Sequence, residues 1–238
     1  RIRVLIYRLS CHRESRSLYE RTDFTYKERI MITEKMLDSL REDISKGMSA
    51  KRFFHTAEVE KMAVRLGELY APELIPELRA AALLHDITKE YPTVLQLSIC
   101  RDEGVELEAD AIFAPKTLHA RTAAALIPKL YPEFATETVI SCVRWHTTGR
   151  EGMSVFEKII FLADYIDDTR TYPSCISLRD EFFSAKPEKM NEMERIRHLD
   201  RAALDSIENT LSYLQLKERS IHPLTLEART DLNARLGK

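Results

Sequence analysis

The stretch 80–86 constrains the fold of this chain most, because an apolar run there ends in two adjacent metal-binding side chains. At helical spacing Leu78, Ala82 and His85 share one face, and that face is apolar enough to belong to a core. His85 is therefore carried inward, and Asp86 follows it. Burial of an unpaired carboxylate is very costly, so Asp86 needs a partner. A cation held together with His85, an arginine or a helix N-terminus would each serve.

Composition and periodicity favour an all-α fold. Only 6 glycines occur among 238 residues, and alternating, strand-like runs are few. The length fits one large helical domain with a sizeable core. We expect residues 1–25 to be an N-terminal extension that the sequence leaves unassigned, and residues 26–238 to form a single helical domain.

The overall charge and the cysteines narrow the partners and the compartment. The formal net charge of −2 gives no general attraction to nucleic acid or to anionic membranes. No apolar run approaches the roughly 18 residues of a transmembrane helix. The four cysteines are widely spaced, which indicates free thiols in a reducing cytoplasm. We expect a cytoplasmic protein that binds neither nucleic acid nor membranes; the oligomeric state, a homodimer included, stays open.

Caps, prolines and apolar spacing divide the chain into helices. Gly47 is suited to a left-handed cap after the first helix, and Ser49 can cap the second. Residues 173–186 are expected to form a connector. The predicted helices cover about 26–45, from Ser49 onward, 76–86, 92–104, 115–128, up to His146, 154–166, 187–219 and 224–236.

Imidazole and carboxylate groups recur where an apolar stripe closes or is interrupted. The set consists of His55, His85, Asp86, His119, His146 and Asp164. These donors suit iron, manganese or zinc. Four histidines and two aspartates exceed one four-coordinate site, whereas two cations sharing Asp86 would use them all. Such a metal pair is typical of enzymes that hydrolyse phosphate bonds.

The alternative is purely structural. A single histidine on an apolar face is more often a hydrogen-bonded core residue than a ligand. Four of the seven histidines on inward faces of an aliphatic core make that reading less economical. For the other three, His12, His198 and His222, ordinary surface or loop positions are expected.

Five segments carry a resemblance to a known family: RFFHT (52–56), LLHDITKE (83–90), LHA (118–120), RWHTTGREGMS (144–154) and KIIFLADYI (158–166). The ordered pattern His…His-Asp…Asp resembles the HD superfamily of metal-dependent phosphohydrolases. The fuller set is similar to the HD-domain bis(5′-nucleosyl)-tetraphosphatases of the symmetrical kind. The likeness covers about residues 26–236, whereas residues 1–25 fall outside it.

This resemblance implies an all-helical HD bundle around a binuclear metal site. It implies that His55, His85, Asp86 and Asp164 hold one iron, while His119 and His146 hold a second and Asp86 bridges the two; manganese is the alternative metal. The implied reaction cleaves diadenosine tetraphosphate and similar dinucleotides into two nucleoside diphosphates. The chain differs from the family at 168–170, where Asp-Thr-Arg stands in place of Pro-Asn-Arg.

Basic and hydroxyl side chains near these ligands suit a polyphosphate substrate, because catalysis of phosphoryl transfer is mainly positioning and electrostatics. The expected substrate-binding residues are Lys89, Thr147, Thr148, Gly149, Arg150 and Arg170, and the expected catalytic residues are Asp86, Lys89 and Arg150. The alternative for each basic residue is an exposed surface charge. No phosphate-binding loop of the P-loop type is present. Trp145 and Tyr165 could stack on a base, but core packing is the more common role of such residues.

Two other functions remain open at this point. The chain could be another HD phosphohydrolase that acts on nucleoside mono- or triphosphates or on cyclic nucleotides. It could also be a non-catalytic signalling module that keeps the HD fold without metal. Proteins of that last kind usually lose ligands, and here all six are present.

Overall fold

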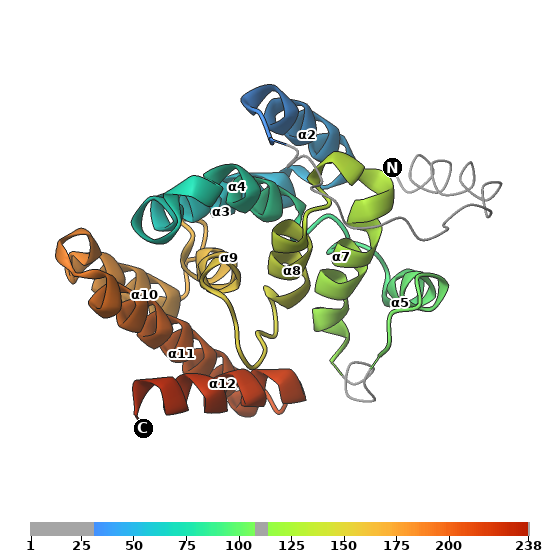
Figure 1. The fold of residues 1–238 in the computed structure, drawn as a ribbon. Coiled ribbons are helices and arrows are strands. Elements are labelled where there is room, and N and C mark those ends of the chain that lie inside the picture. Colours follow the sequence, from blue (N-terminus) through green and yellow to red (C-terminus); the bar gives the residue numbers. More distant parts are fainter. Residues whose placement is uncertain (1–30, 108–113, 238) are drawn as a thin grey trace, which may run out of the picture.

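Helix α4 (Ile75–Leu84) packs among α2 (Glu34–Gly47), α3 (Ala50–Tyr70), α8 (Glu137–Trp145) and α9 (Val155–Ile166) (Figure 1). The computed structural model describes residues 31–107 and 114–237. The second half of α4 is apolar on every side, and its residues 80–84 are completely buried. A helix that is hydrophobic all round belongs in a core, which is where this one lies.

Close approach of α3 to α4 depends on Gly67. A Cβ atom on this residue would lie 3.0 Å from Cδ1 of Leu78 and 3.2 Å from Cγ1 of Ile75. Because both neighbours belong to the packed start of α4, a side chain at position 67 would push the two helices apart. The glycine therefore helps to set the distance between the helix that carries His55 and the helix that ends before His85.

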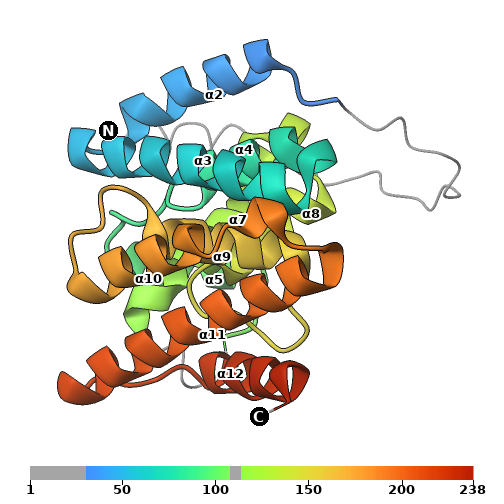
Figure 2. The ribbon, with the colours of Figure 1, turned by 90° about the vertical axis from the view of Figure 1, so that its left-hand side faces the viewer.

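The remaining elements lie beside this group of helices and, in the views of Figures 1 and 2, below it. Helix α7 packs against α8 on one side and α5 on the other, whereas α10, α11 and α12 form the C-terminal part, with α11 packed on α9. Short 3₁₀ turns precede or follow several helices. The further bounds are η1 (Pro72–Leu74), α5 (Thr93–Asp102), η2 (Pro115–Thr117), α7 (Leu118–Leu130), η3 (Pro132–Phe134), α10 (Pro173–Ser184), η4 (Pro187–Lys189), α11 (Glu192–Leu216) and α12 (Pro223–Leu236).

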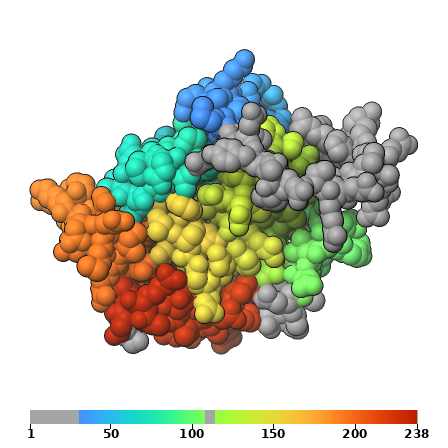
Figure 3. All heavy atoms as spheres, in the orientation of Figure 1, coloured from blue at the N-terminus to red at the C-terminus, as the bar shows by residue number. Residues whose placement is uncertain are grey.

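A second apolar cluster joins the C-terminal helices to the rest. Phe161 of α9 and Met153 pack with apolar residues of α11 and α12, among them Ile207 and Leu232. Figure 3 shows the red C-terminal segment lying directly against the yellow segment of the central helices. Through Met153 this cluster anchors the end of the loop between α8 and α9.

Several local predictions are confirmed. The Ser49 side chain accepts a hydrogen bond from the backbone N–H of Arg52, so it caps α3. Ser154 and Glu157 form the reciprocal capping box at the start of α9. The described residues contain helices and no strand, which confirms the all-α prediction. Cys100, Cys142 and Cys175 are free, buried thiols, whereas Cys11 and His12 lie outside the described residues.

Other boundaries differ from the predictions for identifiable reasons. The first described helix begins only at Glu34, because the Thr33 side chain caps it; positions 26–30 of the predicted helix lie outside the described residues. Gly47 ends that helix, but positive φ angles occur at other glycines. The predicted connector 173–186 is mostly helix α10, whose buried Cys175, Leu178 and Phe182 follow helical spacing.

Two further helix boundaries in the structure also differ from the predicted ones. The long helix begins at Glu192 rather than at Pro187, since Asn191 and Glu194 form a capping box there and residues 187–189 make a separate 3₁₀ turn. Pro128 lies inside α7, which continues to Leu130.

In the part of the chain that the structure describes, we find no helix with the length and apolar character needed to cross a membrane.

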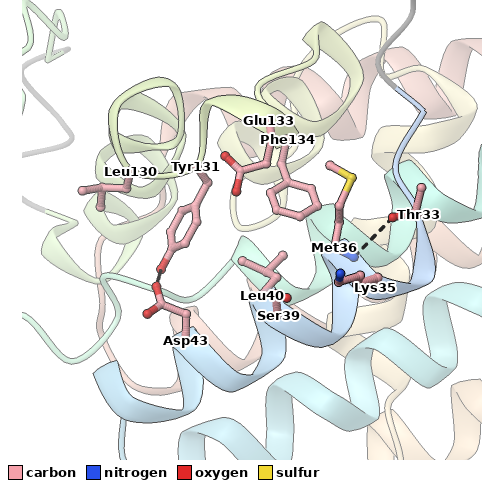
Figure 4. Close-up of a pocket in the computed structure, with 10 residues that line it drawn as sticks. All are labelled: Thr33, Lys35, Met36, Ser39, Leu40, Asp43, Leu130, Tyr131, Glu133 and Phe134. Atoms are coloured by element: carbon pink, nitrogen blue, oxygen red, sulfur yellow. Dashed lines mark hydrogen bonds between the residues drawn. The ribbon is translucent and has the colours of Figure 1, made fainter.

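A cavity of about 470 Å³ opens between α2 and the segment 130–134 (Figure 4). It is lined by apolar side chains such as Met36 and Phe134 together with polar ones, and in its wall the Tyr131 hydroxyl donates to Asp43. None of the six predicted metal ligands lines this cavity. The chemistry expected from the sequence therefore lies elsewhere.

Candidate metal centre

The six predicted ligands converge. His55 Nε2 lies 3.0 Å from Oδ1 of Asp164, and His119 Nε2 lies 3.0 Å from His146 Nε2. They arrive from α3, from the turn after α4, from the first turn of α7, from the end of α8 and from α9. The predicted ligands on the first four of these segments are buried, whereas Asp164 on α9 is partly exposed. One compact group of nitrogen and oxygen donors therefore lies where the central helices meet.

The two oxygens of Asp86 face two different pairs of histidines. Oδ2 lies 3.4 Å from Nε2 of His85 and 3.9 Å from Nε2 of His55. Oδ1 lies 3.1 Å from Nε2 of His119 and 3.7 Å from Nε2 of His146. The carboxylate thus stands between two half-sites, and Asp164 belongs to the His55 and His85 side. This arrangement would suit a carboxylate that contacts two cations, one on each side.

Backbone carbonyl groups fix the tautomers of three histidines. Nδ1 of His85 lies 2.6 Å from the Ala82 oxygen, and Nδ1 of His146 lies 2.7 Å from the Val143 oxygen. His119 makes the same contact with Lys116 at 2.8 Å. A carbonyl oxygen only accepts, so each Nδ1 must carry the proton and each neutral ring turns the lone pair of Nε2 toward the centre. Those nitrogens are prepared to bind a cation.

His55 is held in a different way. Its Nδ1 lies 3.0 Å from the Thr169 hydroxyl and 3.4 Å from Oδ2 of the fully buried Asp167. The Thr169 hydroxyl in turn donates to Asp167. A carboxylate behind a ligating imidazole raises its basicity and fixes its orientation. Asp167 and Thr169 therefore complete the site from behind His55.

Buried donor atoms that lack hydrogen-bond partners indicate that this set of side chains fits a metal. Nε2 of His85 and Oδ1 of Asp86 are buried and have no hydrogen-bond partner among the described residues. Nε2 of His119 also faces Oδ1 of Asp86 with its lone pair, so two acceptors meet at 3.1 Å. Buried polar atoms normally have partners, and a cation would satisfy all of these at once.

The charge states of His119, His146 and Asp164 agree with metal ligation. Burial and the Lys89 ammonium lower the pKa of His119 to about 3, and burial lowers the pKa of His146. Burial opposes ionisation of Asp164, but Arg170 and the hydrogen bond from His55 hold its pKa well below the usual range. Burial lowers the pKa of His55, yet hydrogen bonds to Asp164 and Asp167 outweigh it and raise the value to about 9. A metal would displace that proton.

Three cationic side chains border the cluster. The Arg170 guanidinium pairs with Asp164 and lies 3.2 Å from Asp167, and Nη1 of Arg52 donates to Oδ2 of Asp86 at 2.6 Å. The Lys89 nitrogen lies 3.0 Å from Nε2 and 3.5 Å from Nδ1 of His119. Similar distances to both ring nitrogens place the ammonium over the ring face rather than on the Nε2 lone pair. Lys89 therefore stands beside the second half-site without filling it.

The loop after His146 contributes one hydroxyl to the centre. Thr147 Oγ1 lies 3.1 Å from Nε2 of His119 and 3.0 Å from Nε2 of His146. Thr148 is buried and donates instead to the Gly149 carbonyl oxygen. Gly149 has φ +64°, and a Cβ atom there would lie 3.1 Å from Cβ of Ala228. Of these three predicted substrate-binding residues, the structure brings only Thr147 into contact with the ligands.

Arg150 is engaged away from the ligands. Its Nε and Nη2 donate to the two oxygens of the buried Glu157 at 3.0 and 2.9 Å, and its third nitrogen donates to the Glu151 carbonyl oxygen. Its guanidinium also lies 5.9 Å from the centre of the Trp145 ring. These contacts tie the loop that carries Thr147 to the start of α9.

Three residues of the site were missed by sequence reasoning. Arg52 lies one turn before His55, so its helical spacing was a signal that could have placed its charge on the same face as His55. Asp167 and Thr169 follow α9, and their contact with His55 depends on how that loop turns back toward α3. The histidines assigned elsewhere do lie elsewhere: His198 Nε2 is 3.0 Å from the Phe182 carbonyl oxygen. His222 lies in the loop before α12, as expected, and caps that helix; it is buried, and Nη2 of Arg121 lies 3.4 Å from its Nε2.

Comparison with known proteins agrees with this geometry. Residues 52–169 match the family model described as HD domain. The chain is 30% identical to a symmetrical bis(5′-nucleosyl)-tetraphosphatase of Halalkalibacterium halodurans over 78% of this chain and 90% of the relative. For the enzyme of the same name from Bacillus subtilis the identity is 28%, over 76% and 89%.

A solved structure is similar as well. It is described as a predicted HD superfamily hydrolase involved in NAD metabolism from Clostridium acetobutylicum. The TM-score is 0.72 with 32% sequence identity, and the match covers 83% of this chain and 97% of that one. The sequence similarity and the similarity of fold therefore both indicate an HD-domain protein, and both extend over most of this chain.

Proposed function

The chain belongs to the HD-domain family that includes the symmetrical bis(5′-nucleosyl)-tetraphosphatases, and we propose from this that it is a metal-dependent hydrolase of dinucleoside polyphosphates. Its preferred substrate is diadenosine tetraphosphate or a close relative. Water adds to one of the two inner phosphorus atoms, the central bridging P–O bond breaks, and two nucleoside diphosphates leave. The balance is one water consumed for each dinucleotide.

The observation that carries the proposal is the placement of Asp86 between two histidine pairs. His55, His85 and Asp164 would hold one metal, His119 and His146 the other, and Asp86 would contribute one oxygen to each. When bound, such a pair lowers the pKa of a water and neutralises charge on phosphoryl oxygens. Imidazole and carboxylate donors suit iron, with manganese as the alternative.

The protein's own contribution is charge and orientation at the open side of the cluster. Lys89 is about one-third exposed, and its ammonium can donate to a phosphoryl oxygen while it stays beside His119. Thr147 supplies a neutral donor on the same side. Arg170, also about one-third exposed, is proposed as an outer contact for the remaining phosphates. Arg150, Thr148 and Gly149 act on the substrate only through the shape of the loop that carries Thr147.

The direct test is product identification after metal reconstitution. Metal-free protein is loaded anaerobically with Fe²⁺ or Mn²⁺ and incubated with diadenosine tetraphosphate. We expect ADP as the sole nucleotide product. AMP together with ATP would contradict the symmetrical cut, and no turnover with either metal would contradict the proposal as a whole.

A panel of other nucleotides separates the remaining functions. The neighbour from C. acetobutylicum is described as taking part in NAD metabolism, so NAD belongs in that panel with mononucleotides and cyclic nucleotides. Higher kcat/KM on any of these would favour another phosphohydrolase of the same superfamily. Absence of bound metal after anaerobic preparation would favour a non-catalytic HD module.

A further inference from the structure

A bridging carboxylate works only if its plane is held in one rotation. The terminal torsion of an aspartate side chain is soft, so packing alone does not define it well. In Asp86 a rotation about that bond would turn Oδ1 away from His119 and His146. The structure must therefore contain a group that fixes the carboxylate plane.

Arg52 makes the contact that can do this. Its Nη1 donates to Oδ2 of Asp86 at 2.6 Å, on the side of His55 and His85. Hydrogen bonds between ionised partners are short and strong, and the Asp86 side chain is almost fully buried, where screening by water is weak. With Oδ2 pinned, Oδ1 is left on the side of His119 and His146.

Hydrogen bonds between Glu90 and Ser49 hold the helix turn that carries the arginine in place. Glu90 accepts hydrogen bonds from the backbone N–H and the hydroxyl of Ser49, at 2.8 and 2.5 Å. Ser49 in turn caps the helix turn that carries Arg52. The first turn of α3 and the turn after α4 are thus joined twice, once through Asp86 and once through Glu90. The guanidinium reaches Asp86 from a fixed base.

We infer that Arg52 is a positioning residue that sets the rotation of the bridging carboxylate, and thereby completes the second half-site. The inference rests on the proposed metal centre and assigns this arginine a task within it. The two half-sites depend on the arginine unequally. The first retains His55, His85 and Asp164 without it, whereas among the residues that the structure describes Asp86 is the one carboxylate beside His119 and His146.

The test is Mn²⁺ binding to metal-free protein without substrate, followed by calorimetry and electron paramagnetic resonance. The wild type is expected to bind two ions with the spectrum of an exchange-coupled pair. Arg52→Gln should keep one ion, lose affinity for the second by about tenfold or more, and show the hyperfine pattern of an isolated ion. Arg52→Lys keeps the charge with one compact donor group, so it should restore part of the second affinity.

The matched control is Lys51→Gln, which removes one positive charge from the same helix turn at an exposed position. It should bind two coupled ions like the wild type. The inference fails if Arg52→Gln, shown to be folded by circular dichroism, binds a coupled pair with unchanged affinity, or if it loses both ions together.

Failure of this inference is distinguishable from failure of the proposed function. A wild type that cleaves dinucleotides, with an Arg52→Gln variant that still holds the coupled pair, would remove only the role of Arg52. A wild type that binds a coupled pair but hydrolyses no dinucleotide would remove the proposed substrate and leave that role intact.

Discussion

Oδ1 of Asp86 lies 3.1 Å from Nε2 of His119, although Asp86 follows α4 and His119 belongs to the first turn of α7. Because the Nδ1 proton of His119 is committed to the Lys116 carbonyl, both facing atoms are electron donors. Two such donors are stable at this distance when a cation lies between or beside them. The proposal that this site holds two metals can therefore be tested by substitutions at several residues.

Lys89 is predicted to act on the substrate rather than on the metals. Lys89→Met should lower kcat/KM for diadenosine tetraphosphate by about a hundredfold or more, because one preorganised positive donor at the phosphates is lost. Metal content should stay at the wild-type level, as measured by elemental analysis. Lys116→Met removes an exposed ammonium three residues before His119 and should leave both quantities unchanged. Loss of metal in the Lys89 variant would mean that the lysine serves the centre itself.

Gly149 is predicted to matter for both conformation and packing. Gly149→Ala adds the cost of a left-handed φ of +64° and brings a Cβ atom to 3.1 Å from Ala228, so it should destabilise the protein by about 2 kcal/mol or more. Gly152→Ala is the matched control, since its φ is +69° but its nearest neighbour is 3.7 Å away. Urea denaturation should show the smaller loss for Gly152→Ala. Equal losses would show that packing on α12 adds nothing.

The Arg150–Glu157 pair is predicted to hold the loop that carries Thr147. Arg150→Ala leaves the buried Glu157 with the Ser141 hydroxyl and the Ser154 N–H as its partners. We expect a moderate loss of stability of about 1–3 kcal/mol and a lower kcat with little change in KM. Steady-state kinetics distinguish this from direct phosphate binding, in which KM would rise strongly.

The buried pair of Lys158 and Asp200 is predicted to be structural. It joins α9 to α11, and both side chains are at most 8% exposed. Lys158→Met leaves Asp200 as an uncompensated buried charge and should cost about 3–5 kcal/mol, whereas Lys158→Met combined with Asp200→Leu should recover much of that. Chemical denaturation of the two variants measures the difference. A double variant as unstable as the single one would contradict this account.

Sequence reasoning found the six side chains that the structure brings together because they lie at or near the ends of apolar helix stripes, as His146 does after Val143. Their role as metal ligands stays a prediction. Sequence reasoning also found the caps at Ser49 and Ser154, since capping is local chemistry. It could not foresee that Arg150 pairs with Glu157, because that choice depends on how the loop 147–153 folds back onto α9.

The contacts of Arg52 and Asp167 were beyond sequence reasoning too, since they join segments that only tertiary packing brings together. Helix α10 is a different case. Its apolar spacing was present in the sequence, although residues 173–186 were expected to form a connector. Where local pattern and tertiary contact agree, the prediction is confirmed; where a side chain has a choice of partners, the structure decides.

The most direct test of the central claim is metal analysis of Asp86→Ala combined with product identification on diadenosine tetraphosphate. Because Asp86 is the one carboxylate that both half-sites share, we expect this variant, folded by circular dichroism, to retain no stable metal pair and to release no ADP. Two bound metals and full turnover in Asp86→Ala would contradict the account.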